Sequence, residues 1–359
     1  MSTTTRWTRR HLDLITEDPV TTAPPILGPV EAALPGLDLW DMWPIQEEDN
    51  ATALFDGREL WMGLTAPAAG HPEDRHDVAR IRLLALDEGK WIDLGNLFPD
   101  GESPGSREWS GTAIRRADGT VSVFYTATGH RGERRPTFVQ RVFEARLPLA
   151  PGQSRSAEHR EIVLPDRRFY LPADEVEGGP GRIRAFRDPA WFRGRLLIAA
   201  SIPWEDRHMG AIALTGPESE GWPPRPPLLV ADGINREIER PHVVVHDGLH
   251  YLFFCTHRQS FEPAGAAPTG LYGFVSPTLE GPYEPLNGSG LVIGNPADQP
   301  DQAYAWMVLG DLRVVSFLDY RGPVDRAHFG GTPAPMLRLR LDGPRTRLTE
   351  DGGAAVTRL

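Results

Sequence analysis

Cysteine is almost absent from this sequence, since Cys255, within "YLFFCTH", is the single one among 359 residues. One cysteine can form no intrachain disulfide and no thiolate metal cluster, so we expect a small apolar side chain in a strand. The sequence also lacks HExxH and CxxC motifs, histidines clustered at metal-ligand spacing and glycine-rich phosphate loops. We therefore expect no metal and no other cofactor.

Long basic runs and long apolar runs are missing as well. Acidic residues outnumber basic ones by 49 to 38, the formal net charge is −11, and "RGERRP" at 131–136 is the main basic patch. The negative electrostatic potential of such a chain repels phosphate backbones, so we expect no nucleic acid partner. No segment is long and apolar enough for a membrane span or, at the N-terminus, a signal peptide. We expect cytoplasmic residence, with export by another route as the alternative.

Helical periodicity is scarce, whereas 35 prolines and 37 glycines punctuate the chain. A tight turn followed by an apolar strand recurs five times, beginning at Asp56, Asp118, Arg193, Asp247 and Gly310. These turns are 54 to 75 residues apart, which is room for a four-stranded unit with its loops. The repeat predicts an all-β, five-bladed propeller in a single domain over 1–359, with a lead-in of about 36 residues. Five unrelated hairpins in a sandwich are the alternative.

Polar and aromatic residues occupy the segment before each turn: "LWDMW", "REWSG", "FRDPAWF", "EIERPH" and "QAYAW". If these are the innermost strands, their side chains converge on a central axial pocket. Glu237 and Glu239 stand at strand spacing and lean to one face, whereas Arg240 points to the other, where a structural ion pair is expected. Carboxylates combined with arginine and tryptophan are typical of a sugar site.

At this point six ordered motifs carry a resemblance: "LWDMWPIQ" (39–46), "EWSGTA" (108–113), "FRDP" (186–189), "EIERPH" (237–242), "YLFFCTHR" (251–258) and "QAYAW" (302–306). Together they resemble glycoside hydrolase family 68, which contains levansucrases, inulosucrases and bacterial β-fructofuranosidases on a five-bladed propeller. The resemblance spans roughly residues 6 to 325.

The resemblance implies a role for each residue that matches a family motif. Asp41 would be the nucleophile that attacks a fructosyl unit, Glu239 the general acid and base, and Asp188 the stabiliser of the transition state. The residues implied to bind substrate are Trp40, Trp109, Ser110, Arg187, Glu237, His257 and Tyr304. Read without this context, Asp41 and Asp188 also suit turns, and His257 suits a buried core position.

The chemistry agrees with that division of roles. A double displacement needs an ionised carboxylate and a protonated carboxylic acid about 5 Å apart. We expect like-charge repulsion between Glu237 and Glu239 to keep one of them protonated near neutral pH, while Arg187 or Arg240 holds another carboxylate ionised.

The sequence departs from the family pattern in two informative places. Only about 50 residues separate Asp188 from Glu239, and "IAAS" stands where the family has a Phe-Glu-Gly-Asn-like segment. A shorter segment here would make the rim of the sugar site shallower, and a shallower rim would favour water or unusual acceptors over growth of a polymer. Arg236 replaces the Asp that precedes the glutamate pair in calcium-binding members, so we expect no structural calcium.

We predict an enzyme that cleaves a small-molecule β-fructofuranoside, and we expect this substrate to be sucrose. The reaction would proceed through a fructosyl-Asp41 intermediate and pass fructose to water or to a sugar. Two alternatives stay open. One is a related propeller glycosidase acting on another glycoside, and the other is a sugar-binding propeller without catalysis.

Overall fold

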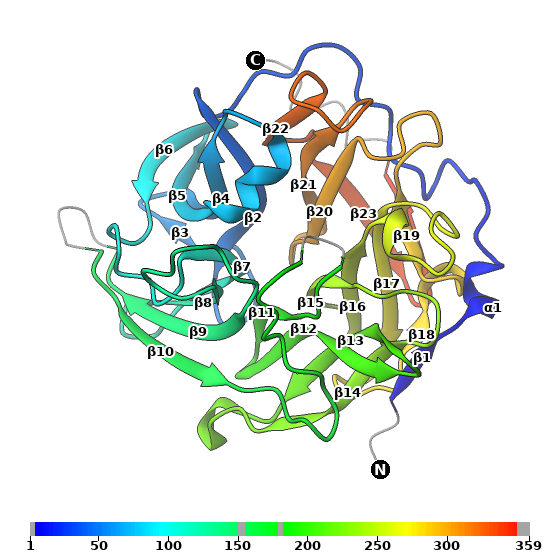
Figure 1. The fold of residues 1–359 in the computed structure, drawn as a ribbon. Coiled ribbons are helices and arrows are strands. Elements are labelled where there is room, and N and C mark those ends of the chain that lie inside the picture. Colours follow the sequence, from blue (N-terminus) through cyan, green and yellow to red (C-terminus); the bar gives the residue numbers. More distant parts are fainter. Residues whose placement is uncertain (1–3, 150–154, 179–181, 350–359) are drawn as a thin grey trace.

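Five blades of mainly antiparallel strands surround a central axis, and one strand of each blade lies innermost (Figure 1). The structure is a computed structural model and describes residues 4–149, 155–178 and 182–349. The innermost strands are β2 (Leu37–Gln46), β7 (Arg107–Arg115), β11 (Phe186–Phe192), β15 (Glu239–His246) and β20 (Ala303–Val308). These five strands contain the polar and aromatic motifs of the sequence, so the predicted five-bladed propeller is confirmed and the sandwich alternative is wrong.

Blades 1 and 2 follow each other along the chain. Blade 1 adds β3 (Leu54–Phe55), β4 (Arg58–Pro67), β5 (Arg80–Asp87) and β6 (Lys90–Asn96) to β2. Blade 2 adds β8 (Val121–Thr128), β9 (Gln140–Leu147) and β10 (Glu158–Val163) to β7. A short parallel pairing of β2 with β7 joins the two blades into one continuous sheet.

Blades 3 to 5 complete the ring. Blade 3 consists of β11, β12 (Arg195–Trp204), β13 (Arg207–Thr215), β14 (Pro224–Ala231) and the N-terminal β1 (Thr5–Trp7). Blade 4 consists of β15, β16 (Leu249–Thr256), β17 (Gly270–Ser276), β18 (Glu284–Pro285) and β19 (Leu291–Gly294). Blade 5 consists of β20, β21 (Arg313–Tyr320), β22 (Phe329–Pro333), β23 (Leu337–Asp342) and β24 (Arg345–Leu348).

Helices are short among the described residues. They are α1 (Arg9–Leu12) and the 3-10 turns η1 (Pro72–Asp77), η2 (Glu218–Glu220), η3 (Arg258–Ser260) and η4 (Leu286–Gly288). In the described part of the chain no helix has the length and apolarity to cross a membrane.

The five predicted turns lead into the second strand of each blade, namely β4, β8, β12, β16 and β21. At Asp56-Gly57 both residues have positive φ, 50° and 82°, as a type I′ hairpin turn requires. Arg193-Gly194 and Asp247-Gly248 repeat this geometry. The dipeptides therefore predicted the turns for a physical reason: glycine adopts the left-handed backbone conformation of a type I′ turn at a low cost in free energy.

The lead-in packs on the outside of the ring rather than forming a separate body. β1 runs parallel to β14, and the indole of Trp7 is fully buried among aromatic rings that include Phe254, Phe261 and Tyr272. Its Nε1 donates to the carbonyl oxygen of Ser289 at 3.1 Å. The N-terminal segment therefore ties blade 3 to blade 4. Cys255 is buried in β16, as predicted.

Every innermost strand contains a β-bulge within its polar and aromatic motif. The register shifts occur between Trp40 and Trp43, Trp109 and Gly111, Arg187 and Ala190, Glu239 and His242, and Tyr304 and Met307. Four of the bulges place a non-glycine residue at positive φ: Asp41 (42°), Asp188 (54°), Arg240 (49°) and Ala305 (55°). A bulge inserts an extra residue and redirects its side chain, which brings groups from five separate strands to one axis.

Arg240 joins three of these strands. Its Nη1 donates to the carbonyl oxygen of Ala305 at 2.5 Å and its Nη2 to that of Met42 at 2.7 Å. Arg240 therefore has the structural role predicted from the sequence, but the predicted ion pair is wrong, because its partners are backbone carbonyls of β20 and β2 rather than a carboxylate.

We predict that Arg240→Lys lowers the free energy of unfolding by about 2 kcal/mol, because one ammonium cannot reach both buried carbonyls. Urea denaturation of the purified variant measures this. The same change at Arg338, which donates to the carbonyl oxygen of Asp311 on the exposed surface, is the control and should cost little. Equal effects of the two changes would contradict the role given to Arg240.

Candidate active site

The guanidinium of Arg187 lies at the centre of the carboxylates near the axis. Its Nη2 donates to Oε1 of Glu237 and, at 3.0 Å, to Oε1 of Glu239, while its Nε is 3.8 Å from Oδ2 of Asp188. Only 5% of the side chain is exposed, and the neighbouring carboxylates outweigh burial and raise its pKa. A permanent positive charge therefore interacts with three acidic residues from two blades.

Glu237 reaches Arg187 from a loop and not from a strand. β15 begins at Glu239, so the prediction that one continuous strand carries both glutamates is wrong. The side chain of Asn235 accepts from the backbone N–H of Glu237 at 2.8 Å, and the hydroxyl of Thr256 donates to the carbonyl oxygen of Glu237 at 2.7 Å. These two contacts fix the loop, because a buried backbone group must find a partner within the protein.

The two glutamates have opposite protonation tendencies. Burial raises the pKa of Glu237 to about 7, with Arg187 opposing the rise and Glu239 adding to it. Burial also disfavours the charge on Glu239, but Arg187, His257 and the hydroxyl of Tyr304 outweigh it and lower the pKa. These opposite shifts favour a proton on Glu237 over one on Glu239 in the unliganded protein, and retention of one proton by the pair near neutral pH stays a prediction.

Asp188 and Asp41 lie on the bulges of blades 3 and 1, on either side of blade 2. The backbone N–H of Arg240 donates to Oδ2 of Asp188 at 3.2 Å. Burial raises the pKa of Asp188 to about 7, opposed by Arg187 and reinforced by Glu239 and Asp41. Burial also raises the pKa of Asp41, while the charge of Arg240 opposes it.

Exposure separates these carboxyl groups into two sets. Asp188 and Glu237 are buried, whereas Asp41 and Glu239 are partly exposed. The side chain of Ser110 lies beside Asp41 and, like the charge of Arg240, opposes the rise in its pKa. The partly exposed carboxyls are therefore those that an entering molecule can meet.

Aromatic rings enclose this carboxylate cluster. The ring of Trp109 lies 5.9 Å from the guanidinium carbon of Arg187. The rings of His257 and Tyr304 stack with their centroids 3.5 Å apart, and the hydroxyl of Tyr304 donates to Oε2 of Glu239. Burial lowers the pKa of His257, so its imidazole favours the neutral form. All ten side chains named from the sequence thus belong to one axial region.

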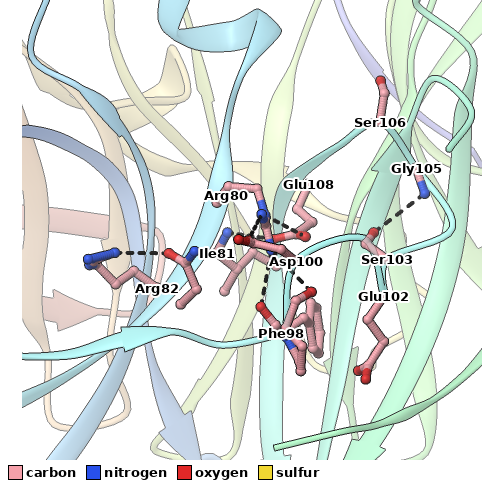
Figure 2. Close-up of polar contacts among 12 residues, drawn as sticks. Arg80, Ile81, Arg82, Phe98, Asp100, Glu102, Ser103, Gly105, Ser106 and Glu108 are labelled. Carbon is pink, nitrogen blue, oxygen red and sulfur yellow. Dashed lines mark hydrogen bonds and ion pairs between the residues drawn. The ribbon is translucent and has the colours of Figure 1, made fainter. Parts of the chain in front are cut away.

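A clamp between blades 1 and 2 fixes the strand that carries Trp109. Figure 2 shows Arg80 between the carboxylates of Glu108 and Asp100 and the carbonyl oxygen of Phe98. The second carboxylate oxygen of Glu108 accepts from the backbone N–H of Ile81 at 2.7 Å. Because Glu108 directly precedes Trp109, this buried carboxyl group positions the indole.

Sequence reasoning missed several residues of this region. Gln140 accepts from the backbone N–H of Phe186 at 3.1 Å and lies 3.5 Å from Nη1 of Arg187. Arg75 and His76, in η1, contact the ring of Trp40. Their segment, "HPEDRHD", is charged and contains proline, which is also the composition of an ordinary surface loop.

A metal site is not evident in the described ranges, where no three His, Cys, Asp or Glu residues come together as ligands. Arg236, which precedes Glu237, instead forms an ion pair with Glu262 at 2.9 Å. The geometry therefore concentrates partly exposed carboxyls, a cation and indole rings at one place, which suits chemistry at a sugar acetal.

Comparisons with known proteins agree with this chemistry. The model of the Levansucrase/Invertase family matches residues 1–195 and 189–354. A levansucrase of Zymomonas mobilis is 32% identical over 393 residues, covering 97% of this chain and 90% of the relative.

Solved structures share the fold over nearly the whole chain. An inulosucrase from Halalkalicoccus jeotgali bound to kestose superposes with a TM-score of 0.88 at 36% identity, covering 99% of both chains. A levansucrase from Gluconacetobacter diazotrophicus, at 24% identity, shares the fold with a TM-score of 0.80 over 98% of this chain and 92% of the other.

We predict that Glu108→Ala lowers the free energy of unfolding by about 3 kcal/mol, because Arg80 and the buried N–H of Ile81 both lose their partner. Thermal and urea denaturation measure the loss. Glu158→Ala, on the exposed face of β10, is the matched control and should change stability little. A Glu108 variant as stable as that control would show that the clamp is dispensable.

Proposed function

Because the chain belongs to the Levansucrase/Invertase family, glycoside hydrolase family 68, we propose that it cleaves sucrose with retention of configuration and transfers the fructosyl unit. The acceptor is water, as for a β-fructofuranosidase, or a sugar, as for a levansucrase. The observation that carries the proposal is the convergence of Asp41, Asp188 and Glu239 from three bulged strands, where Arg187 contacts Glu239 and Asp188 and the charge of Arg240 acts on Asp41. The names of the relatives, levansucrase and inulosucrase, support the same substrate class.

In the first step, a carboxylate oxygen of Asp41 attacks the anomeric carbon of the fructosyl unit. The bond from that carbon to the leaving oxygen breaks, and Glu239 gives its proton to this oxygen, so that free glucose departs. Asp188 stabilises the positive charge that develops on the fructosyl ring. In the second step, Glu239 takes a proton from the acceptor hydroxyl, whose oxygen attacks the anomeric carbon and releases Asp41.

Glu237 supplies the proton that the first step requires. In the unliganded protein Glu239 accepts hydrogen bonds from Arg187 and Tyr304, which favour its charged form. A leaving group bound beside Glu239 excludes water from this partly exposed carboxylate, and the desolvation disfavours its charge, so the proton of the pair passes to Glu239. Arg187 can move with the charge, because one of its nitrogens contacts both carboxyl groups.

Water and sugar acceptors share every step up to the fructosyl intermediate. The hairpin of β12 and β13 is the short segment that follows Asp188. We propose that a low rim on this side favours water and small acceptors over a growing polymer. The cytoplasmic location stays a prediction.

We predict that Asp41→Asn reduces glucose release from sucrose by a factor on the order of 10⁴, because an amide cannot form the intermediate. Glu239→Gln should lose roughly 10² to 10⁴ on sucrose but keep a rapid first burst of fluoride release from β-fructofuranosyl fluoride, whose leaving group needs no proton; turnover then slows because the base of the second step is missing. Separate glucose, fructose and fluoride assays measure these effects.

Asp298→Asn, at an exposed surface position, is the control and should match the unaltered protein. Undiminished sucrose cleavage by the Asp41 variant would refute the assignment. So would an initial burst of fluoride release that slows as much as glucose release in the Glu239 variant.

We predict that kcat/KM for sucrose falls as pH rises through about 7, where the buried Glu237 and Glu239 pair loses its proton. Glu237→Gln removes a negative charge beside Glu239, which lowers the pKa of Glu239 further. The descending limb of the profile should therefore move to lower pH. A limb that stays in place would show that the proton does not come from this pair.

A further inference from the structure

The 3-10 turn η1 of blade 1 reaches the axial site although it stands far from every family motif in sequence. It begins after His71, whose Nδ1 accepts from the backbone N–H of Glu73, and it ends at Asp77. Its two residues Arg75 and His76 are the ones that lie against the site, and the mechanism above uses neither of them.

Arg75 anchors this turn across the boundary between blades 1 and 5. The buried guanidinium lies 5.5 Å from the ring centre of Trp40 and 4.7 Å from that of Phe329, which belongs to β22. It donates to Glu73 at 2.8 Å, and Glu73 in turn accepts from the hydroxyl of Tyr320 at 2.7 Å. The turn is therefore held in one place by cation–π contacts and by an ion pair between buried Arg75 and partly exposed Glu73, unlike a loose surface loop.

His76 contacts both indoles that the sequence assigned to the sugar. Its ring meets that of Trp40 edge to face with centroids 5.9 Å apart, and its carbonyl oxygen accepts from Nε1 of Trp109 at 3.1 Å. These contacts fix His76 between Trp40 of β2 and Trp109 of β7.

The ring nitrogens of His76 have no hydrogen-bond partner within the described residues, and the nearest carboxylate oxygen, from Glu73, is 3.8 Å from Nε2. Burial and Arg75 lower the pKa of His76 to about 3, so the imidazole is neutral and presents one donor and one acceptor. With 21% of its side chain exposed, it can offer both to an entering hydroxyl-rich molecule.

We propose that His76 hydrogen-bonds the sugar on the leaving-group and acceptor side of the site and so helps to select the molecule that receives the fructosyl unit. This inference rests on the proposed function. Arg75 is a positioning residue that acts through the turn and through Trp40.

The placement on that side follows from the neighbours of His76. It contacts Trp40 and Trp109, which flank the carboxylate cluster, and the charges that act on it include those of Glu239 and His257. Glu239 is the group proposed to protonate the leaving oxygen, so residues flanking its exposed part flank the leaving glucose and its replacement. His257 is partly exposed as well, whereas Asp188 and Glu237, on the inner side of the cluster, are buried.

The test compares the unaltered protein with His76→Ala and His76→Gln. Rates of glucose and fructose release are measured over a range of sucrose concentrations, with added glucose as inhibitor. We expect His76→Ala to raise both the KM for sucrose and the inhibition constant of glucose about threefold to tenfold, with kcat changed less than threefold. His76→Gln, which keeps a donor and an acceptor, should recover part of the loss.

Asp74→Asn, at an exposed position of the same turn, is the control and should leave all constants unchanged. Active protein in which His76→Ala alters neither constant would overturn the inference alone. A fall in kcat with both constants unchanged would overturn it too, because it would mark a structural role. An unaltered protein that does not cleave sucrose would overturn the proposed function and this inference with it.

Discussion

The bulge in each innermost strand is the feature on which the rest of the site depends. A regular strand would alternate its side chains between the two faces of a blade, and few of them could point along the axis. The bulges at Asp41, Asp188 and Arg240 instead put single residues into left-handed backbone and turn them inward. Such a conformation costs free energy at a non-glycine residue, and contacts such as the two carbonyls held by Arg240 offset it.

Once the carboxyl groups are gathered, their mutual repulsion becomes the second constraint. Arg187 partly neutralises Glu237, Glu239 and Asp188, and burial together with the remaining repulsion favours protons on the most buried groups. This arrangement stores a proton next to Glu239 without placing it there in the resting protein. The arrangement gives the two neighbouring glutamates, Glu237 and Glu239, a common purpose, because they share the cation of Arg187 and one proton.

Much of the fold was predictable because its signals are local. Turns such as Asp56-Gly57 and Asp247-Gly248 have a backbone requirement that shows in the residues themselves, and the polar motifs before them marked the inner strands. The start of β15 was not predictable, because the loop at Glu237 is fixed by Asn235 and by Thr256, which comes from another strand. The role of Arg75 and His76 was hidden for the same reason, since their partners Trp40, Trp109 and Phe329 are distant in sequence.

The central claim is that Asp41 carries the fructosyl unit during turnover. The most direct measurement is mass spectrometry of the Glu239→Gln protein after brief reaction with β-fructofuranosyl fluoride, because this variant can form the intermediate but lacks the base that releases it. The account predicts a mass increase of one fructosyl unit, located on the peptide that contains Asp41. Fluoride release without any adduct, or an adduct located on Asp188, would contradict it.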